Sequence, residues 1–417
     1  MRISALRREA SGGRARVAAD VVWEDADRPA LTVHFETEER FAGAIAPSPD
    51  AFLTGCIIPA VRHGERRIRV EGAVCPELRE GLRGALTILA GWKHGEPPAI
   101  RIEASEGFRP PPRRAPPRVG SMFSGGVDSL YTIRMNLLEV PRDHPAAIRD
   151  GILILGHDSG TPDVTRIELD RHERRAGSLA ELAAECGIEL ISMRFNLRDL
   201  DDDLAFYIDD FFGAALAAAG HALTPRLSAI SIPSSYDFRH LIPCGSHALI
   251  DPQYASTALA IRHDGAARTR LEKLAVVAAW PEGFRRLHTC NWRMPAGDRV
   301  NCGACEKCLR SAVGLLVLGR LGEAETFRES DVTPDALRAL PWNVGFEAYW
   351  GELAVGLRRI GRSDLAAIVE EKLDAARRFR QWREETDGKG LVKRFDRRFL
   401  GGSIAAIARA MRRPRPR

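Results

Sequence analysis

The chain has 417 residues, of which 45% are hydrophobic and 28% are charged, and its formal net charge is +5. These values are ordinary for a globular protein, so they exclude a disordered or fibrous chain, and the length suggests several domains at roughly 100 to 200 residues each. Apolar stretches such as "GAALAAAG" (residues 213–220) are too short to span a bilayer, which takes ~20 residues. We therefore expect no transmembrane helix. Because the first residues lack the apolar segment of a signal peptide, we also expect a cytoplasmic protein.

Residues 1–107 are expected to form a small β-rich domain of unknown role. Strand-like runs occur at residues 30–37, 66–74 and 98–105, and one helix is expected at residues 77–92. The stretch "FRPPPRRAPPRVG" follows, and its prolines interrupt any helix or central strand. The sequence thus predicts a linker at residues 108–118.

Strand-like and helix-like segments alternate from residue 119 onward. The strand-like runs are "VGSMF", "GILILGH", "IELISMRF" and "LSAISIPSS", and the helices between them include residues 127–140 and a long helix at residues 203–220. This alternation predicts a parallel sheet covered by helices on both faces, a Rossmann-like α/β fold. In such folds, ligands bind beyond the carboxyl ends of the strands. We expect residues 119–315 to form the catalytic domain.

Residues 316–417 are expected to form a helical extension with a basic tail. Residues 371–417 contain 15 Lys or Arg and 6 Asp or Glu. Such a tail is typical of a solvated terminus, and a contact with nucleic acid or with an acidic partner is the alternative. Nucleic acid is not the favoured partner, and the sequence leaves the oligomeric state open, a homodimer included.

The stretch "SMFSGGVDSLYT" (residues 121–132) joins a predicted strand to a predicted helix. A helix that begins near Val127 places this turn at the carboxyl edge of the sheet. Gly125 and Gly126 permit backbone conformations and a close approach that a Cβ would block, and the helix N-terminus offers unpaired amide donors to an anion. The turn therefore indicates a phosphate-binding loop, and a helix N-cap at Ser124 with a tight glycine turn is the alternative.

The polar side chains of this loop indicate its chemistry. The hydroxyls of Ser124 and Ser129 can donate hydrogen bonds to phosphate oxygens. Asp128 would repel phosphates unless a cation lay between them, so it predicts Mg²⁺. The lysine of a Walker loop is absent.

The string "SGGVDS" resembles the SGGxDS motif of the PP-loop ATP pyrophosphatase superfamily. The resemblance implies a Rossmann-like sheet that binds ATP and transfers AMP to a substrate oxygen with release of pyrophosphate. It also implies that adenine lies along the end of the next strand, where the backbones of Ile154 and Leu155 could contact it. His157 could line the same cleft, and a surface turn explains His157 equally well.

Four cysteines cluster in "CNWRMPAGDRVNCGACEKCLRS" with the spacing C-x11-C-x2-C-x2-C. They are Cys290, Cys302, Cys305 and Cys308. In a reducing compartment such spacing indicates a metal site, and four thiolates suit a tetrahedral Zn²⁺ ion. An iron–sulfur cluster, which also takes four thiolates, is the alternative.

The combination of this loop with a later Cys-plus-CxxCxxC site resembles QueC, the 7-cyano-7-deazaguanine synthase family, over roughly residues 118–312. The QueC-like proteins of bacterial anti-phage (CBASS-type) operons are one branch that it resembles. The resemblance implies ATP, Mg²⁺ and Zn²⁺ as cofactors. Residues 1–107 and the carboxyl-terminal extension depart from the family, as does "GHDSGTPD" after the second strand, where its usual recognition elements are not evident.

The segment at residues 231–256 is rich in polar side chains, glycine and proline, and it follows the predicted fourth strand. It is therefore expected to overhang the nucleotide, and the resemblance implies a role in substrate recognition. The candidates for the acceptor pocket are Ser234, Ser235, Tyr236, Ser246, His247, Asp251 and Gln253.

Arg270 and Lys273 lie three residues apart, on one face of a predicted helix. They could stabilise the pyrophosphate leaving group, so they join Asp128 and Ser129 as candidate catalytic residues. An exposed basic helix face explains this pair equally well.

The function expected from the resemblance is ATP-dependent adenylylation of a carboxylate, perhaps on a 7-deazaguanine, and its transfer to a nitrogen nucleophile. The nucleophile is ammonia or the amine of a partner protein, which would then carry the nucleobase. The alternatives are a PP-loop enzyme that modifies tRNA and a nucleotide-binding interaction module without catalysis.

Overall fold

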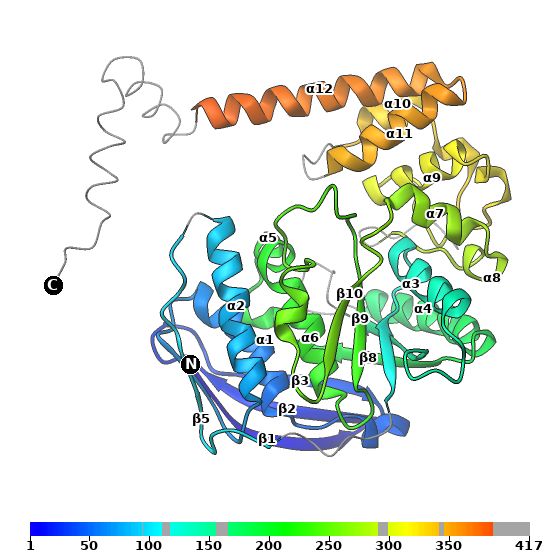
Figure 1. The fold of residues 1–417 in the computed structure, drawn as a ribbon. Coiled ribbons are helices and arrows are strands. Elements are labelled where there is room, and N and C mark those ends of the chain that lie inside the picture. The colour runs from blue at the N-terminus through cyan, green and yellow to red at the C-terminus, as the bar shows by residue number, and fades with distance from the viewer. Residues whose placement is uncertain (94, 111–116, 156–165, 291–298, 342–345, 387–417) are drawn as a thin grey trace, which may run out of the picture.

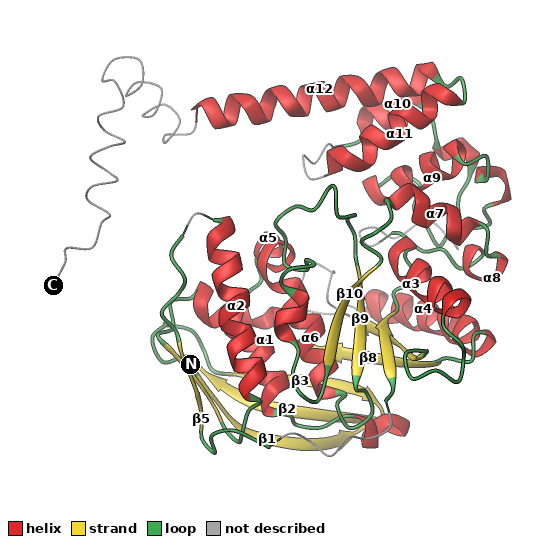
Figure 2. Ribbon diagram, in the orientation of Figure 1, coloured by secondary structure: helices red, strands yellow, loops and turns green. Residues whose placement is uncertain are grey.

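The structure, a computed structural model, describes residues 1–93, 95–110, 117–155, 166–290, 299–341 and 346–386. It is a mixed α/β protein built on one ten-stranded sheet (Figures 1 and 2), so the predicted mixed class is confirmed. The strands are β1 (Arg2–Ser11), β2 (Arg14–Val22), β3 (Leu31–Glu38), β4 (Arg67–Val70), β5 (Arg101–Ala104), β6 (Val119–Met122), β7 (Ile148–Leu155), β8 (Glu189–Phe195), β9 (Ala229–Pro233) and β10 (Ala260–Asp264).

The strand order is β10-β9-β6-β7-β8-β3-β2-β1-β4-β5. The five strands from β10 to β8 are parallel to one another, as the alternating pattern predicts. Within this group the chain runs outward from β6 in both directions, through β7 and β8 on one side and through β9 and β10 on the other. The loops after β6 and β9 therefore diverge at the carboxyl edge, where open α/β sheets bind their ligands.

The first strands of the chain extend this same sheet. β3 pairs antiparallel with β8, in register Phe35 to Phe195, and β2 and β1 follow. The sheet twists strongly, so that β1 and β2 run across the lower part of Figure 1 while β9 and β10 stand nearly upright. Sheet and core are thus continuous across the boundary expected at residues 108–118, of which 111–116 lie outside the described residues.

Helices cover both faces of the parallel strands, and strand alternation decides which side chain meets which layer. Ile152 of β7 joins the core under α1, α2 and α6, whereas its neighbour Leu153 joins the core under α3, α4 and α7. The helices are α1 (Pro49–Arg62), α2 (Pro76–Trp92), α3 (Val127–Glu139), α4 (Arg166–Glu185), α5 (Leu204–Phe206), α6 (Phe212–Ala222), α7 (Arg270–Ala278), α8 (Pro281–Phe284), α9 (Glu306–Val317), α10 (Pro334–Ala339), α11 (Glu347–Arg359) and α12 (Ser363–Thr386).

The elements that were not predicted include β1, β2, β10 and α1. α1 is buried around most of its circumference, from Asp50 to Ala60, so it lacks the polar face from which a surface helix is recognised. The long helix expected at residues 203–220 is interrupted by a π-helical turn at Tyr207–Phe211. Gly245 causes this interruption, because its N–H donates to the carbonyl of Ile208 and its carbonyl accepts from the N–H of Gly213.

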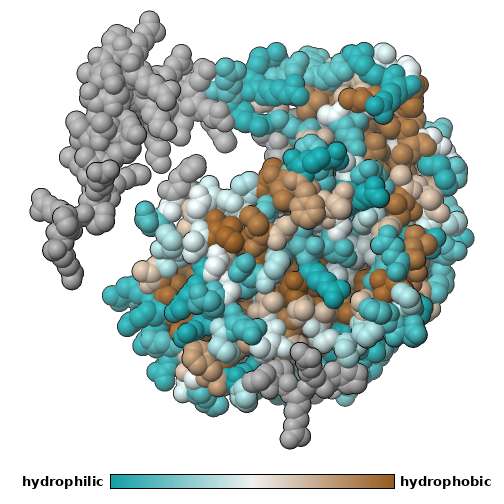
Figure 3. Space-filling view, viewed as in Figure 1, coloured by the Kyte–Doolittle hydropathy of each residue, from teal (hydrophilic) through white to brown (hydrophobic). Residues whose placement is uncertain are grey.

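The carboxyl-terminal part of the described chain is helical, as expected, and its core is continuous with that of α3 and α7. α12 packs along α11 at the top of Figure 1, and its outer side is hydrophilic in Figure 3, with hydrophobic side chains gathered beneath it. Residues 387–417, the basic tail, lie outside the described residues. Among the helices that the structure describes, none combines the length and apolarity needed to cross a membrane.

Candidate functional site

The loop between β6 and α3 is a glycine turn at the carboxyl edge of the sheet. Gly125 has φ +73°, in the left-handed region, and Gly126 is the N-cap residue of α3. No side chain caps this helix, so the alternative of a Ser124 N-cap is not what the structure contains. The first amide groups of α3 have no intrahelical carbonyl, which is the usual condition for binding an anion.

The two hydroxyls of the loop lie together at this helix end. Ser129 donates to the carbonyl of Gly126 at 3.1 Å, and its Oγ is 3.3 Å from that of Ser124. Neighbouring segments also fix two backbone carbonyls of the loop. The carbonyl of Gly125 accepts from the N–H of His288 at 2.9 Å, and the carbonyl of Ser124 accepts from Arg175. These contacts hold the loop in one conformation before any ligand binds.

Asp128, in the first turn of α3, forms an ion pair with Arg270, and its Oδ1 lies 3.6 Å from Nζ of Lys273. Arg270 begins α7, and the helix end is fixed by a capping box between Thr269 and Glu272. The side chains of Arg270 and Lys273 are 14% and 1% exposed, so they do not form an exposed basic face. The structure thus places three predicted catalytic residues in contact, with Ser129 one residue further along α3.

Burial and charge act on this group in opposite directions. Burial lowers the pKa of Lys273, and the nearby charge of Arg270 lowers it further, while Asp128 offsets part of this effect. Burial alone would lower the pKa of Arg270, but Asp128, together with Tyr349 and Glu306, outweighs burial and raises it. One carboxylate is therefore shared by two buried cations, which leaves a surplus of positive charge beside the loop.

Arg310 and Tyr349 were not predicted as parts of this site. The guanidinium of Arg310, on α9, lies over the ring of Tyr349 at 4.4 Å, and Arg270 lies 5.9 Å from the same ring. A small cavity lined by Val127, Arg270, Arg310 and Tyr349 lies between α3, α7, α9 and α11. The side chain of Arg310 is 6% exposed, and its Nη1 donates no hydrogen bond within the described residues. This buried donor is a further candidate for contact with an anion, and no motif in the sequence indicated it.

Three of the residues predicted for the acceptor pocket lie beside Lys273 and Tyr349. The carbonyl of Ser234 accepts a hydrogen bond from Nζ of Lys273 at 2.6 Å, and the carbonyl of Ser235 accepts one from Tyr349. Tyr236 stacks on Tyr349 with ring centroids 5.1 Å apart, and its burial raises its pKa to about 12. This loop after β9 therefore meets the carboxyl-terminal helices at the same edge of the sheet.

The other predicted acceptor residues form a separate polar cluster, on the side of the sheet covered by α2 and α6. Asp251 is fully buried and accepts from Ser246 at 2.8 Å and from Nδ1 of His263 at 2.7 Å. His247 packs edge-on against Trp92 of α2 at 4.8 Å. The structure does not bring these residues into contact with Asp128. Strand alternation on β10 contributes to this separation, because His263 bonds to Asp251 whereas the next residue, Asp264, lies near Lys273 on the other side.

The remaining predicted residues are accounted for by packing or by their position. Gln253 packs closely against Gly81 of α2. A Cβ added to Gly81 would lie 2.0 Å from the carbonyl oxygen of Gln253. Ile154 and Leu155 are buried at the end of β7, the strand next to β6. His157 lies outside the described residues.

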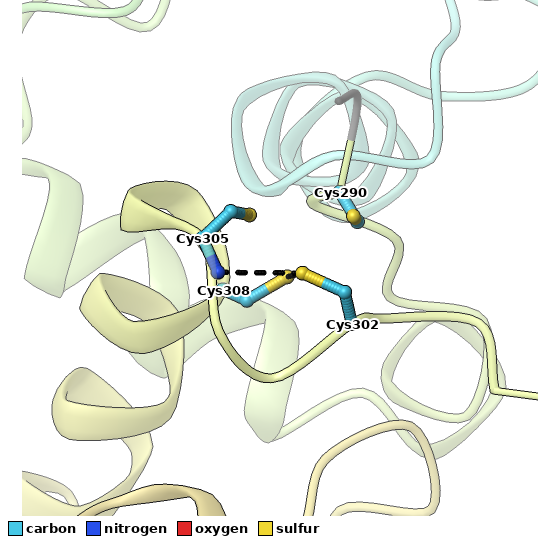
Figure 4. Close-up of side chains that lie close together, drawn as sticks. All are labelled: Cys290, Cys302, Cys305 and Cys308. Atoms are coloured by element: carbon cyan, nitrogen blue, oxygen red, sulfur yellow. Dashed lines mark hydrogen bonds between the residues drawn. The ribbon is translucent and has the colours of Figure 1, made fainter. Parts of the chain in front are cut away.

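The four clustered cysteines come together beside the amino-terminal end of α9 (Figure 4). Their Sγ atoms lie within 4.8 Å of one another, and those of Cys302 and Cys308 are 3.7 Å apart. Thiolates at about 2.3 Å from one tetrahedral ion would be about 3.8 Å apart. In an iron–sulfur cluster the four thiolates are divided among two or four iron atoms, so they would not all lie this close together. The four cysteines could therefore hold a single metal ion.

The thiolate forms of these four residues destabilise one another when no cation is bound. Cys290 raises the pKa of Cys305 to about 12, because a second thiolate next to the first is destabilised. The N–H of Cys305 donates to Sγ of Cys302 at 3.3 Å, which would stabilise charge on that sulfur. A bound cation would favour the thiolate form of all four residues.

Asn301 organises this element and was not predicted. Its side chain is fully buried, and its Oδ1 accepts from the N–H groups of Thr289 and Cys290 at 2.9 and 3.2 Å. Its Nδ2 donates to the carbonyl of Leu287 at 2.9 Å. Asn301 thus holds the segment that carries Cys290 against the turn that carries Cys302. The position of Asn301 directly before Cys302 was the only sequence signal for this role. These three partners of Asn301 lie more than ten positions earlier in the chain, so the sequence did not indicate them.

The cysteine cluster and the charged residues beside the glycine turn are linked through α9. This helix carries Cys308, which is a member of the cluster. It also carries Arg310, two residues later, which lies over Tyr349 beside the loop. Whatever holds the cysteines together therefore also fixes the start of the helix that carries Arg310. In comparisons with known proteins, no family model, no curated protein and no solved structure matches this chain.

Proposed function

We propose that this protein is a QueC-like, ATP- and Mg²⁺-dependent enzyme that adenylylates a carboxylate with release of pyrophosphate and transfers the acyl group to a nitrogen nucleophile. The observation that carries the proposal is the contact of Asp128 with Arg270 and Lys273 beside a glycine turn, at the point where the order of the parallel strands reverses. We assign the parallel strands with their helices to a Rossmann-like fold, because the order of β8, β7, β6, β9 and β10 is the doubly wound order.

The residues around the turn fit a polyphosphate. The positive φ of Gly125 turns the chain sharply into α3, and the amides of the first turn of α3 and the hydroxyls of Ser124 and Ser129 supply donors. Arg270, Lys273 and Arg310 supply buried positive charge, which would stabilise a leaving pyrophosphate. Bound ATP would supply an electrophilic α-phosphate, and these residues would orient it and exclude water.

Asp128 fits a cation in addition to its basic partners. Its Oδ1 is buried and accepts no hydrogen bond from the described residues, and Nζ of Lys273 is 3.6 Å away. A carboxylate oxygen with free lone pairs next to a phosphate site is the usual protein ligand of Mg²⁺. We therefore assign Asp128 to hold Mg²⁺, and Arg270 to fix the orientation of the carboxylate.

We assign the metal at Cys290, Cys302, Cys305 and Cys308 as Zn²⁺, with a structural role. All four positions are filled by protein thiolates, so no open position for substrate remains. The ion would join the segment that carries Cys290 to α9, and it would thereby keep Arg310 near the loop.

We place the acceptor beside Ser234, Ser235 and Tyr236, because these residues lie next to Lys273 and Tyr349. A planar nucleobase such as a 7-deazaguanine suits a site bordered by stacked tyrosines. The nucleophile is ammonia or the amine of a partner protein, and the second choice corresponds to nucleobase conjugation in anti-phage defence. Ser246, His247, Asp251 and Gln253 are then scaffold of the loop that follows β9.

Release of pyrophosphate from ATP tests this function. The wild-type chain is incubated with ATP, Mg²⁺ and candidate carboxylates, and pyrophosphate is measured together with the mass of the products. Asp128→Ala should reduce release by at least about 100-fold, the usual effect of losing a charge-stabilising group. Asp335→Ala, which removes a carboxylate that is 95% exposed, is the matched control and should release pyrophosphate at the wild-type rate.

The outcomes separate the alternatives. Tight ATP binding without pyrophosphate release from any acceptor would reject the enzyme and leave a binding module. Release that requires tRNA, and fails with every small carboxylate, would favour the tRNA-modifying alternative. Equal rates for Asp128→Ala and Asp335→Ala would reject the assignment of Asp128.

A further inference from the structure

A second site lies at the opposite edge of the sheet from the glycine turn. Arg118 directly precedes β6, Arg149 is the second residue of β7, and Arg226 lies shortly before β9, so all three mark the amino-terminal ends of parallel strands. Arg40 and Phe41 come from the short helix after β3. These five residues line one open cleft of about 550 Å³.

A buried carboxylate and an aromatic ring hold three of these arginines in place. Asp150 is fully buried and pairs with both Arg118 and Arg226. Arg226 and Arg40 each lie over the ring of Phe41, at 5.5 and 4.5 Å. The guanidinium groups are therefore oriented before any ligand binds, which lowers the entropy cost of binding.

Positive charge exceeds negative charge around the cleft. The carboxylates that pair with its arginines are Glu38, Asp150 and Glu189. Within the described residues Arg149 pairs with no carboxylate, and it donates a hydrogen bond to the carbonyl of Arg142.

Two more cations adjoin the cleft, and they too bond only to carbonyls among the described residues. Arg142 donates to the carbonyls of Ile148 and Gly187 at 3.2 and 2.8 Å, and Arg8 donates to that of Ala42 at 3.0 Å. Burial lowers the pKa of Arg142, and the charge of Arg149 lowers it further, so the two guanidinium groups repel each other. An anion between these groups would relieve the repulsion.

We propose that this cleft binds a ligand that carries several phosphate groups. Arginine is the side chain best suited to phosphate, because its planar guanidinium donates two parallel hydrogen bonds. The cleft is far larger than one phosphate ion, and its arginines come from four separate segments of the chain, which suits a polyphosphate or a stretch of nucleic-acid backbone. The site is independent of the proposed adenylylation, since β6 separates it from the glycine turn.

Binding of sodium tripolyphosphate, measured by titration calorimetry in buffer without divalent cations, tests the proposal. Gly125→Ala serves as the background, because this change is expected to weaken anion binding at the glycine turn. Arg149→Ala and Arg40→Ala should each weaken binding at least about tenfold, the expected loss for one charge-assisted hydrogen bond. Arg328→Ala removes the same charge from an exposed residue far along the chain and should leave affinity unchanged. Affinity should also fall with added salt.

A single-stranded oligonucleotide of about 20 nucleotides distinguishes the two sources of phosphate. Tighter binding than tripolyphosphate, with competition between the two probes, would identify a nucleic-acid backbone. Binding of tripolyphosphate alone would identify a free polyphosphate compound. If Arg149→Ala and Arg40→Ala bind both probes within twofold of Arg328→Ala, the proposal is wrong. Arg40 is 57% exposed, so its variant remains informative even if Arg149→Ala does not fold.

Discussion

Lys273 donates a hydrogen bond from Nζ to the carbonyl oxygen of Ser234 at 2.6 Å, which joins α7 to the loop after β9. The same ammonium group stands 3.6 Å from the carboxylate of Asp128. One buried side chain therefore connects the proposed phosphate site with the proposed acceptor site.

Replacement of this lysine by methionine keeps the size of the side chain and removes its charge. We expect Lys273→Met to slow pyrophosphate release by about 100-fold, because the leaving group loses a buried cation. The matched control is Lys372→Met, since Lys372 also donates to a backbone carbonyl, that of Leu340 at 2.9 Å, but lies on α12. Steady-state pyrophosphate assays compare the two, and equal rates would contradict the role of Lys273.

Loss of one ligand should remove the metal. We expect the wild-type chain to contain about one zinc per chain by elemental analysis, and Cys308→Ser to contain little, because three thiolates bind zinc far more weakly than four. The unfolding temperature of the variant should fall as well, since a bound ion would hold Cys290 against α9. Cys186→Ser, which changes a cysteine outside the cluster, is the control. Iron with visible absorbance in the wild-type protein would show that the zinc assignment is wrong.

The glycine turn should not tolerate a side chain. Gly125→Ala places a Cβ on a residue with φ +73° and 3.0 Å from the side chain of Leu179, so we expect a loss of about 1–2 kcal/mol in unfolding free energy and weaker ATP binding. Gly177→Ala is the matched control, because this glycine lies inside α4 with no atom within 4 Å of an added Cβ. The control should gain about 0.5–1 kcal/mol. Chemical denaturation and ATP titration measure both effects, and wild-type ATP affinity in Gly125→Ala would count against the phosphate site.

The stability of the fold should depend on pH through His34 on β3. Burial lowers the pKa of this imidazole to about 4, and the charge of Arg16 contributes. The unfolded chain takes up a proton near pH 6.5 while the folded chain does not, so stability should decrease as the pH falls from 6.5 to 4. His34→Gln should remove about 1–3 kcal/mol of this decrease, whereas the exposed His144→Gln should leave it unchanged. Denaturation midpoints at several pH values measure the slope, and identical slopes in both variants would reject this origin.

Local sequence patterns were sufficient to predict several features of the structure. The strand, glycine turn and helix at residues 119–139 follow from residue types that are adjacent in the chain. The cysteine cluster likewise follows from spacing, because three of its members lie within seven residues. The burial of Arg270 and Lys273 could not be predicted, since helical periodicity alone describes an exposed basic face and a buried one equally well.

The sequence by itself determined the alternation of strands and helices, the glycine turn and the metal-binding spacing, because each depends on neighbours along the chain. Only the tertiary structure decided that β3 pairs with β8, that Arg310 and Tyr349 adjoin the turn, and that Asp251 and Asp128 lie apart. These relationships join residues separated by up to about 200 positions, and they depend on packing and strand pairing, which no local pattern specifies. The arginine cleft is of the same kind, because its cations come from segments that meet only when the sheet forms.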